Sequence, residues 1–162
     1  MITMQGKPVT ILGKSLAAGD KMPHFTLTAN DLSDAVYDNA SGVRVFLSVP
    51  SLDTPVCDTE VRKFNKKAAE LGAVIYAVSM DLPFAQARWC AAAGIDAVKT
   101  LSDYKYRRFG EVTGTYIKEV GLLARAVFVV GRNGKITYVQ YVPEVTNQPD
   151  YEKAYAAVLA AK

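Results

Sequence analysis

Cysteine is the residue type in this sequence with the greatest capacity for chemistry, and the chain contains two. The first, Cys57, follows an apolar, β-branched segment, residues 43–49, which predicts a buried strand. A helix is predicted over 56–71, because apolar residues recur there at helical spacing, with Glu60 among the charged residues between them, and Gly72 provides a stop signal. Cys57 is therefore expected in the first turn of a helix, where free backbone N–H groups and the positive end of the helix dipole favour a thiolate.

The residues just before Cys57 support this placement and supply a hydroxyl group. Pro50 ends the strand, and Asp53, Thr54 and Pro55 are turn and helix-start signals. The hydroxyl of Thr54 can cap the helix or donate a hydrogen bond to the sulfur three residues later. Most free cysteines are small buried hydrophobic residues, and position alone would favour that interpretation.

The full spacing Pro-x-x-x-Thr-x-x-Cys, from Pro50 to Cys57, favours chemistry instead, because it resembles the motif of the peroxiredoxins. This resemblance implies that Cys57 is the peroxidatic thiolate, which attacks a hydroperoxide. It also implies that Thr54 and Arg125 hold the thiolate and polarise the O–O bond, while Pro50 shields and shapes the loop.

The second cysteine, Cys90, lies late in another predicted helix, residues 83–93. Packing against the neighbouring alanines is its default interpretation. The string Ser79-Met80-Asp81-Leu82-Pro83-Phe84-Ala85-Gln86-Ala87-Arg88-Trp89-Cys90, however, is similar to the signature of the bacterial thiol peroxidases, a subgroup of atypical two-Cys peroxiredoxins. By that resemblance Cys90 is the resolving cysteine, which captures the sulfenic acid as an intramolecular disulfide. A disulfide needs Cα atoms about 4.4–6.8 Å apart, so both helix ends are expected to rearrange during turnover.

Arg125 stands in the otherwise apolar segment 121–128. A buried guanidinium is costly without a partner, which leaves an ion pair with one of the sixteen acids or contact with the Cys57 thiolate. The string around this arginine resembles the region of the thiol peroxidases in which an arginine joins the active site. The resemblance therefore implies the second role, in which a guanidinium also donates to the peroxide oxygens.

Length and composition restrict the class of protein. A chain of 162 residues, half of them hydrophobic and without low-complexity tracts, predicts one domain over 1–162. A net charge of +3 gives no argument for a nucleic-acid partner. The longest apolar run, 121–131, is interrupted by Arg125 and is shorter than the ~20 residues of a membrane helix, and no signal peptide is visible, so a cytoplasmic location without a membrane partner is expected. Two cysteines and one histidine, His24, cannot complete a four-ligand zinc site, and His24 is assigned no role.

The order of the predicted elements fits a thioredoxin-like fold of the α/β class, a central mixed sheet flanked by helices, with a small N-terminal β-hairpin within residues 1–12. The other elements predicted are strands at 25–29, 35–37, 73–79, 98–102, 126–130 and 136–141, a short helix near 105–110, a loop through 113–115, a hairpin turn at 132–135 and a terminal helix over 151–161.

The resemblance covers the chain from about Gly6 to Tyr151 and implies a thioredoxin-dependent peroxidase and homodimer that reduces hydrogen peroxide and alkyl hydroperoxides in antioxidant defence. Such a peroxidase needs no metal, haem or flavin cofactor, because the thiolate carries the chemistry. Apolar Leu52, Val56 and Phe84 favour organic peroxides, although the same residues would serve a core.

Two alternatives stay open. A dithiol oxidoreductase lacks support because no Cys-x-x-Cys is present, and a non-catalytic redox sensor would need the same reactive thiol.

Overall fold

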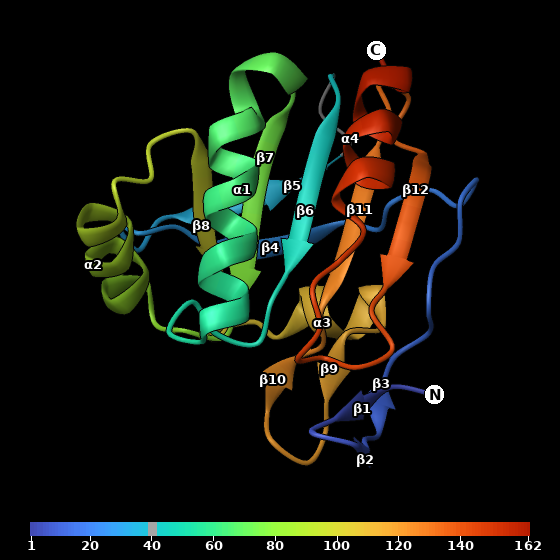
Figure 1. Ribbon diagram of the computed structural model, residues 1–162. Coiled ribbons are helices and arrows are strands. Elements are labelled where there is room, and N and C mark those ends of the chain that lie inside the picture. Colours follow the sequence, from blue (N-terminus) through green and yellow to red (C-terminus); the bar gives the residue numbers. More distant parts are fainter. Residues whose placement is uncertain (39–41) are drawn as a thin grey trace.

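A seven-stranded mixed sheet forms the centre of the computed structural model, which describes residues 1–38 and 42–162 (Figure 1). Its strands lie in the order β12-β11-β6-β7-β8-β4-β5. β6, β7 and β8 run parallel, and the other neighbouring pairs are antiparallel. The predicted strands are confirmed, with ends that differ by at most one residue. Their bounds are Phe25–Thr28 (β4), Asp34–Tyr37 (β5), Arg44–Ser48 (β6), Val74–Ser79 (β7), Val98–Ser102 (β8), Ala126–Val130 (β11) and Ile136–Tyr141 (β12).

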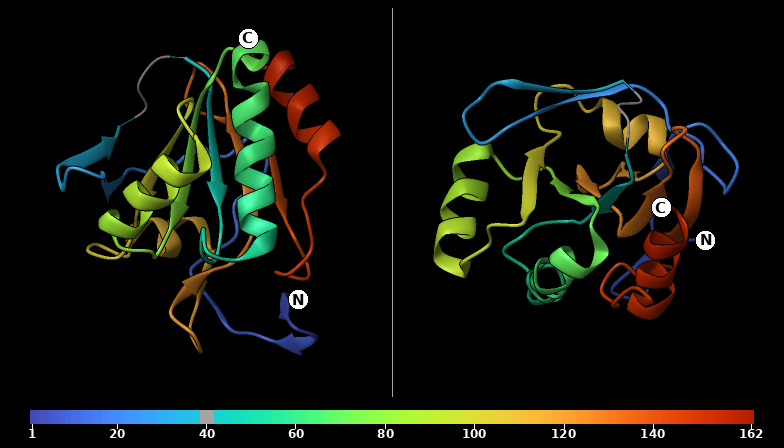
Figure 2. Two further views of the ribbon diagram at one scale, coloured as in Figure 1. Left: turned by 60° about the vertical axis from the view of Figure 1, so that its left-hand side comes forward. Right: turned by 90° about the horizontal axis from the view of Figure 1, so that it is seen from above.

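Helices cover both faces of this sheet, as predicted. α1 and α4 lie on one face, and α2 lies beside β8. α3 lies over the other face, and the β4–β5 hairpin, which forms one end of the sheet, folds over that same face (Figure 2). The predicted helices 56–71, 83–93 and 151–161 are confirmed within one residue. The bounds are Pro55–Leu71 for α1, Pro83–Ala93 for α2, Arg108–Thr113 for α3 and Tyr151–Ala160 for α4.

The near-continuous apolar runs of the central strands follow from burial on both faces. In β6, Val45 and Leu47 pack under α1 and α4, whereas Phe46 points to the opposite face. There it contacts Phe25 and Tyr37 of the β4–β5 hairpin edge-on, with ring centroids 5.3 Å apart in both pairs. One strand therefore supplies side chains to two separate cores, and this fixes its register.

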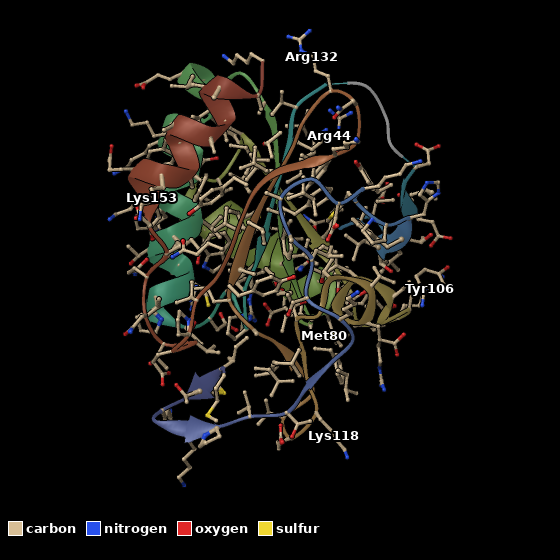
Figure 3. The ribbon with its side chains drawn as sticks, turned by 90° about the vertical axis from the view of Figure 1, so that its right-hand side faces the viewer. Arg44, Met80, Tyr106, Lys118, Arg132 and Lys153 are labelled. Carbon is tan, nitrogen blue, oxygen red and sulfur yellow. The ribbon has the colours of Figure 1, made fainter. Side chains whose placement is uncertain are left out.

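The polypeptide enters α1 and α2 from the carboxyl ends of β6 and β7, and both helices end at a glycine. Gly72 and Gly94 take the left-handed conformation, with φ of 57° and 66°, which costs glycine little. In Figure 3, Met80, which follows β7, marks the carboxyl end of the parallel strands, and Arg132 in the β11–β12 turn marks the opposite end. The first turns of α1 and α2 therefore lie at the carboxyl end of the parallel strands, where open α/β folds bind their ligands.

The N-terminal hairpin is confirmed for residues 3–8 but is shorter than the predicted 1–12. β1 (Thr3–Met4) and β2 (Lys7–Pro8) pair around a two-residue turn. Ile11 and Leu12 instead form β3, which joins a small second sheet with two further short strands. Those strands, β9 (Tyr116–Ile117) and β10 (Leu122–Leu123), were not predicted.

The position of the short third helix was predicted wrongly. It was expected near 105–110 and lies at Arg108–Thr113. Its start is set by the buried carboxylate of Asp103, which accepts hydrogen bonds from two backbone N–H groups of the helix at 3.1 and 2.9 Å. Burial raises the pKa of Asp103 to about 6, and these two hydrogen bonds oppose the rise.

The described part of the chain, residues 1–38 and 42–162, contains no candidate membrane span and no candidate metal site. None of the helices there has the length and apolar character that a membrane crossing requires. No group of three or more His, Cys, Asp or Glu side chains is arranged there to hold a metal ion.

Candidate active site

Cys57 lies in the first turn of α1, as the sequence predicted. Its side chain is completely buried in the core between α1 and the sheet. Thr54 is the N-cap residue and Pro55 occupies the first turn, where its missing N–H removes no helical hydrogen bond. The sulfur is thus held at the positive end of a 17-residue helix.

The hydroxyl of Thr54 lies against the sulfur rather than capping the helix. Its Oγ1 is 2.7 Å from Cys57 Sγ and 3.0 Å from the carbonyl oxygen of Ser51, and it makes no capping hydrogen bond. A hydroxyl has one proton, so Thr54 can donate to only one of these acceptors at a time. Donation to the sulfur is the stronger interaction once the sulfur carries negative charge.

Arg125 directly precedes β11 and reaches the same sulfur. It is 1 % exposed, and its Nη2 donates to Cys57 Sγ at 3.2 Å. Its Nη1 donates to Glu60 Oε2 at 2.5 Å, and its Nε donates to the carbonyl oxygen of Val145 at 2.9 Å. The two interpretations considered for this arginine, an ion pair and contact with Cys57, therefore hold at the same time.

Glu60 is the site residue that sequence reasoning placed wrongly. It was grouped with the solvent-facing charges of the helix, yet its side chain is fully buried one turn after Cys57. Burial raises the pKa of Glu60 to about 7, and the charge and hydrogen bond of Arg125 limit the rise. For Arg125 burial acts downward, but Glu60 and Cys57 outweigh it and hold the pKa above the usual value. The three-residue spacing from Cys57, beside apolar Val61, is the signal that would have found Glu60.

Cys90 lies in α2, as predicted, and points away from Cys57. It is partly buried, and its Sγ is 3.4 Å from Thr100 Oγ1 in β8, which donates to Asn30. Both cysteines are free thiols. Cys90 thus has a polar contact with a strand, and its packing against the neighbouring alanines stays a prediction.

The two sulfurs have different partners. Cys57 contacts Arg125 at the start of β11, whereas Cys90 contacts Thr100 in β8. β6 and β7 lie between β11 and β8, so these partners come from strands that are not neighbours. The structure therefore brings together Cys57, Thr54 and Arg125 but leaves Cys90 apart.

Comparison with known proteins places the chain in a family. The family model described as Redoxin matches residues 17–157. A thiol peroxidase of Halalkalibacterium halodurans is 54% identical over 162 residues, covering 99% of this chain and 98% of the relative. A thiol peroxidase of Bacillus subtilis is 51% identical over 161 residues, covering 98% and 96%. The chain belongs to the bacterial thiol peroxidases of the Redoxin family.

Solved structures of similar proteins share the fold. A peroxiredoxin-like protein from Aquifex aeolicus superimposes with a TM-score of 0.93 at 41% identity, covering 99% of this chain and 96% of the other. A thiol peroxidase from Chromobacterium violaceum shares the fold, with a TM-score of 0.89 at 16% identity and coverage of 98% and 95%. The predicted thioredoxin-like fold is thereby confirmed, and the curated relatives confirm the predicted class of enzyme, a thiol peroxidase.

The loop that carries Pro50 in this thiol peroxidase is fixed by the carboxylate of Asp81, a residue named above only as part of the string that resembles the thiol peroxidases. Asp81, after β7, accepts hydrogen bonds from Ser51 Oγ at 2.7 Å, the Leu52 backbone N–H at 2.8 Å and Ser79 Oγ at 2.7 Å. Pro50 itself is buried. These contacts tie the loop before Cys57 to the end of the neighbouring strand.

Proposed function

We propose that Cys57 of this thiol peroxidase attacks a hydroperoxide as a thiolate. The observation that carries the proposal is that two donors converge on Sγ, the Thr54 hydroxyl at 2.7 Å and Arg125 Nη2 at 3.2 Å. Both donate to a sulfur in the first turn of a helix, where charge-assisted hydrogen bonds and the helix dipole stabilise negative charge. A merely structural buried cysteine needs neither donor.

The same donors suit the peroxide. In the attack a bond forms between Sγ and the terminal peroxide oxygen, the O–O bond breaks, and the departing oxygen takes up a proton to leave as water or an alcohol. As charge moves from the sulfur to the departing oxygen, Thr54 and the planar guanidinium of Arg125 can transfer their hydrogen bonds to the peroxide oxygens. Pro50 is buried beside this loop, which supports its proposed role in shielding the sulfur.

Cys90 is proposed as the resolving thiol. It attacks the sulfenic acid of Cys57, so that the S–S bond forms and water leaves. Because each sulfur contacts a different partner, Arg125 for Cys57 and Thr100 for Cys90, the ends of α1 and α2 are proposed to rearrange before the Cα atoms come within the ~4.4–6.8 Å of a disulfide. A thioredoxin-type dithiol then supplies two electrons and restores both thiols.

Four further expectations accompany this mechanism. The enzyme is proposed to act as one domain, residues 1–162, to be a homodimer and to work in the cytoplasm. A sedimentation mass of 17.6 kDa, that of a single chain, would contradict the dimer.

Activity toward alkyl hydroperoxides as well as hydrogen peroxide is also proposed, supported by apolar Leu52 and half-buried Val56 beside the site, whereas Phe84 is exposed on α2. A large rate preference for hydrogen peroxide over cumene hydroperoxide would contradict it.

The first test measures hydroperoxide consumption with thioredoxin, thioredoxin reductase and NADPH for the wild type, Cys57→Ser and Cys90→Ser. Sustained turnover is expected for the wild type, none for Cys57→Ser, and about one turnover for Cys90→Ser, because its sulfenic acid has no resolving thiol. A wild type that forms the disulfide but is not recycled would favour a redox sensor. Unchanged activity of Cys57→Ser would reject the proposed attacking thiol.

A further inference from the structure

The residues next to the two cysteines are hydrogen-bonded to each other. Asp58 directly follows Cys57 in α1, and Trp89 directly precedes Cys90 in α2. The indole Nε1–H of Trp89 donates to Asp58 Oδ1 at 3.0 Å. The two segments that must move for a disulfide to form are therefore fastened to each other beside the reacting residues.

Arg62, one turn further along α1, strengthens this contact from the other side. Its Nε donates to Asp58 Oδ2 at 2.8 Å, and its Nη1 donates to the carbonyl oxygen of Ala93, the last residue of α2, at 3.2 Å. Its guanidinium carbon also lies 5.9 Å from the centre of the Trp89 ring. Asp58 and Arg62 together hold the C-terminal half of α2 against α1.

This contact cannot persist when Cys90 turns toward Cys57. Successive residues of a helix point about 100° apart, and here Trp89 points to α1 while Cys90 points to Thr100 in β8. Turning Cys90 toward α1 by rotating or unwinding the last turns of α2 carries the indole away from Asp58. The hydrogen bond thus belongs to the arrangement in which the two thiols are apart.

Few residues of α2 are fully buried, and space is present beside the contact. Only Pro83 and Gln86 of its 11 residues are buried. A hollow of about 250 Å³ separates the loop before Cys57 from α2. Its lining consists of Leu52, Asp53, Thr54, Pro55, Asp58 and Trp89. An unwound end of α2 can enter this space once the indole has left Asp58.

We propose that the Asp58–Trp89 hydrogen bond, supported by Arg62, is a latch whose opening sets the rate at which Cys90 resolves the sulfenic acid of Cys57. The inference rests on the proposed function. Resolution forms the S–S bond and releases water, and it competes with a second hydroperoxide, which would oxidise the sulfenic acid to a sulfinic acid and leave as water or an alcohol. By slowing the first reaction, the latch determines how much peroxide the enzyme tolerates. Asp58 and Trp89 act as positioning residues and touch no reacting atom.

Trp89→Phe tests the latch, because it removes the indole donor but keeps an aromatic ring and leaves the charge of Asp58 beside Cys57 unchanged. After a single addition of hydrogen peroxide, quenched samples are separated by mass into sulfenic, disulfide and sulfinic forms. The first-order rate of disulfide formation is expected to rise about two- to tenfold, the range for loss of one hydrogen bond. The sulfinic fraction falls by the same factor, and the rate constant for peroxide attack is unchanged.

Phe84→Ala is the matched control, since it also removes aromatic atoms from α2 but at a position 67% exposed to solvent. Its resolution rate is expected to equal that of the wild type. An unchanged or slower rate in Trp89→Phe, in a protein whose wild type forms the Cys57–Cys90 disulfide, overturns the latch alone. A wild type that forms no such disulfide overturns the proposed function and the latch together.

A second measurement needs no change to the latch, because Trp89 is the single tryptophan of the chain. One equivalent of hydrogen peroxide is added to the reduced wild type and to Cys90→Ser, and tryptophan emission is recorded. The wild type is expected to shift to longer wavelength as the indole leaves Asp58 and enters water, whereas Cys90→Ser keeps its spectrum. An unchanged spectrum in the fully disulfide-bonded wild type would overturn the latch.

Discussion

The two helices that carry the cysteines are held in different ways. α1 buries six of its residues, among them Cys57, Phe64 and the charged Glu60. α2 buries only Pro83 and Gln86, and the side chains of Gln86 and Trp89 make polar contacts with neighbouring elements. Burial of apolar area resists local unfolding, whereas a helix with few buried residues can open without the rest of the fold.

This difference matches the two tasks proposed for the cysteines. The attacking sulfur needs donors fixed at 2.7 and 3.2 Å before the peroxide arrives, and a buried helix provides that geometry. The resolving sulfur has to travel, and a lightly buried helix can release it. The comparison predicts that changes in α1 alter stability and attack, while changes in α2 alter resolution.

The largest effect is expected from replacing a buried phenylalanine of α1 by alanine, and the same replacement in α2 provides the comparison. Phe64→Ala is expected to lower the free energy of unfolding by about 3–5 kcal/mol, because its buried ring packs on Tyr155 at 5.1 Å and leaves a cavity. Phe84→Ala in exposed α2 is expected to change it by less than about 0.5 kcal/mol. Urea unfolding of the reduced proteins measures both, and equal losses would show that the two helices are held alike.

Arg125→Lys is expected to give the next largest effect. One ammonium group cannot replace three separate donors directed at Cys57, Glu60 and Val145. The second-order rate constant for reaction with hydrogen peroxide is expected to fall about 10²–10³-fold, as for other lost donors at reacting centres. Stopped-flow measurements on the reduced protein test this, with exposed Arg132→Lys as the control. A fall of less than tenfold would show that the arginine serves structure alone.

Much of this arrangement could be predicted from the sequence because its signals are local. The strand before Pro50, the helix with Cys57 in its first turn and the glycine ends each depend on a few adjacent residues. The apolar position of Arg125 also indicated a buried cation. Its partner could not be chosen, since Glu60 lies 65 positions away and is one of sixteen acids. The same holds for Asp81, whose partners come from the loop before α1.

The errors have similar causes. The start of α3 depends on a side chain outside the helix, that of Asp103, and not on helical periodicity. β9 and β10 have two residues each, too few to show alternation. The sequence also did not predict that α2 is weakly buried. Its apolar residues indicate a core helix, whereas its place beside β8 leaves most of it accessible to solvent.

Glu60→Gln tests how a buried titratable side chain in α1 affects stability; α2 buries no such side chain. A carboxyl group whose pKa is raised on folding, here from 4.5 to about 7, stabilises the fold when protonated, and this contribution is lost as pH rises through 7. Glutamine still accepts a hydrogen bond from Arg125 but does not titrate. The unfolding free energy of Glu60→Gln relative to the wild type is therefore expected to rise between pH 4.5 and 7.5, by up to about 3 kcal/mol. Both proteins keep Asp103, so its titration cancels, and a flat difference would contradict the prediction.

Thr54→Val tests whether the hydroxyl of Thr54 serves the reaction of Cys57 or the capping of α1. Valine keeps the shape of threonine but cannot donate to Cys57, so the rate constant for peroxide attack is expected to fall about 10–10²-fold, the range for a hydrogen bond to a charged group. Because the hydroxyl makes no capping hydrogen bond, the loss of about 1 kcal/mol usual for a removed cap is not expected. Thr54→Ser, which keeps the donor, is expected to retain most of the rate. A stability loss with unchanged attack would instead assign Thr54 to the structure of α1, and the donors at the sulfur would reduce to Arg125.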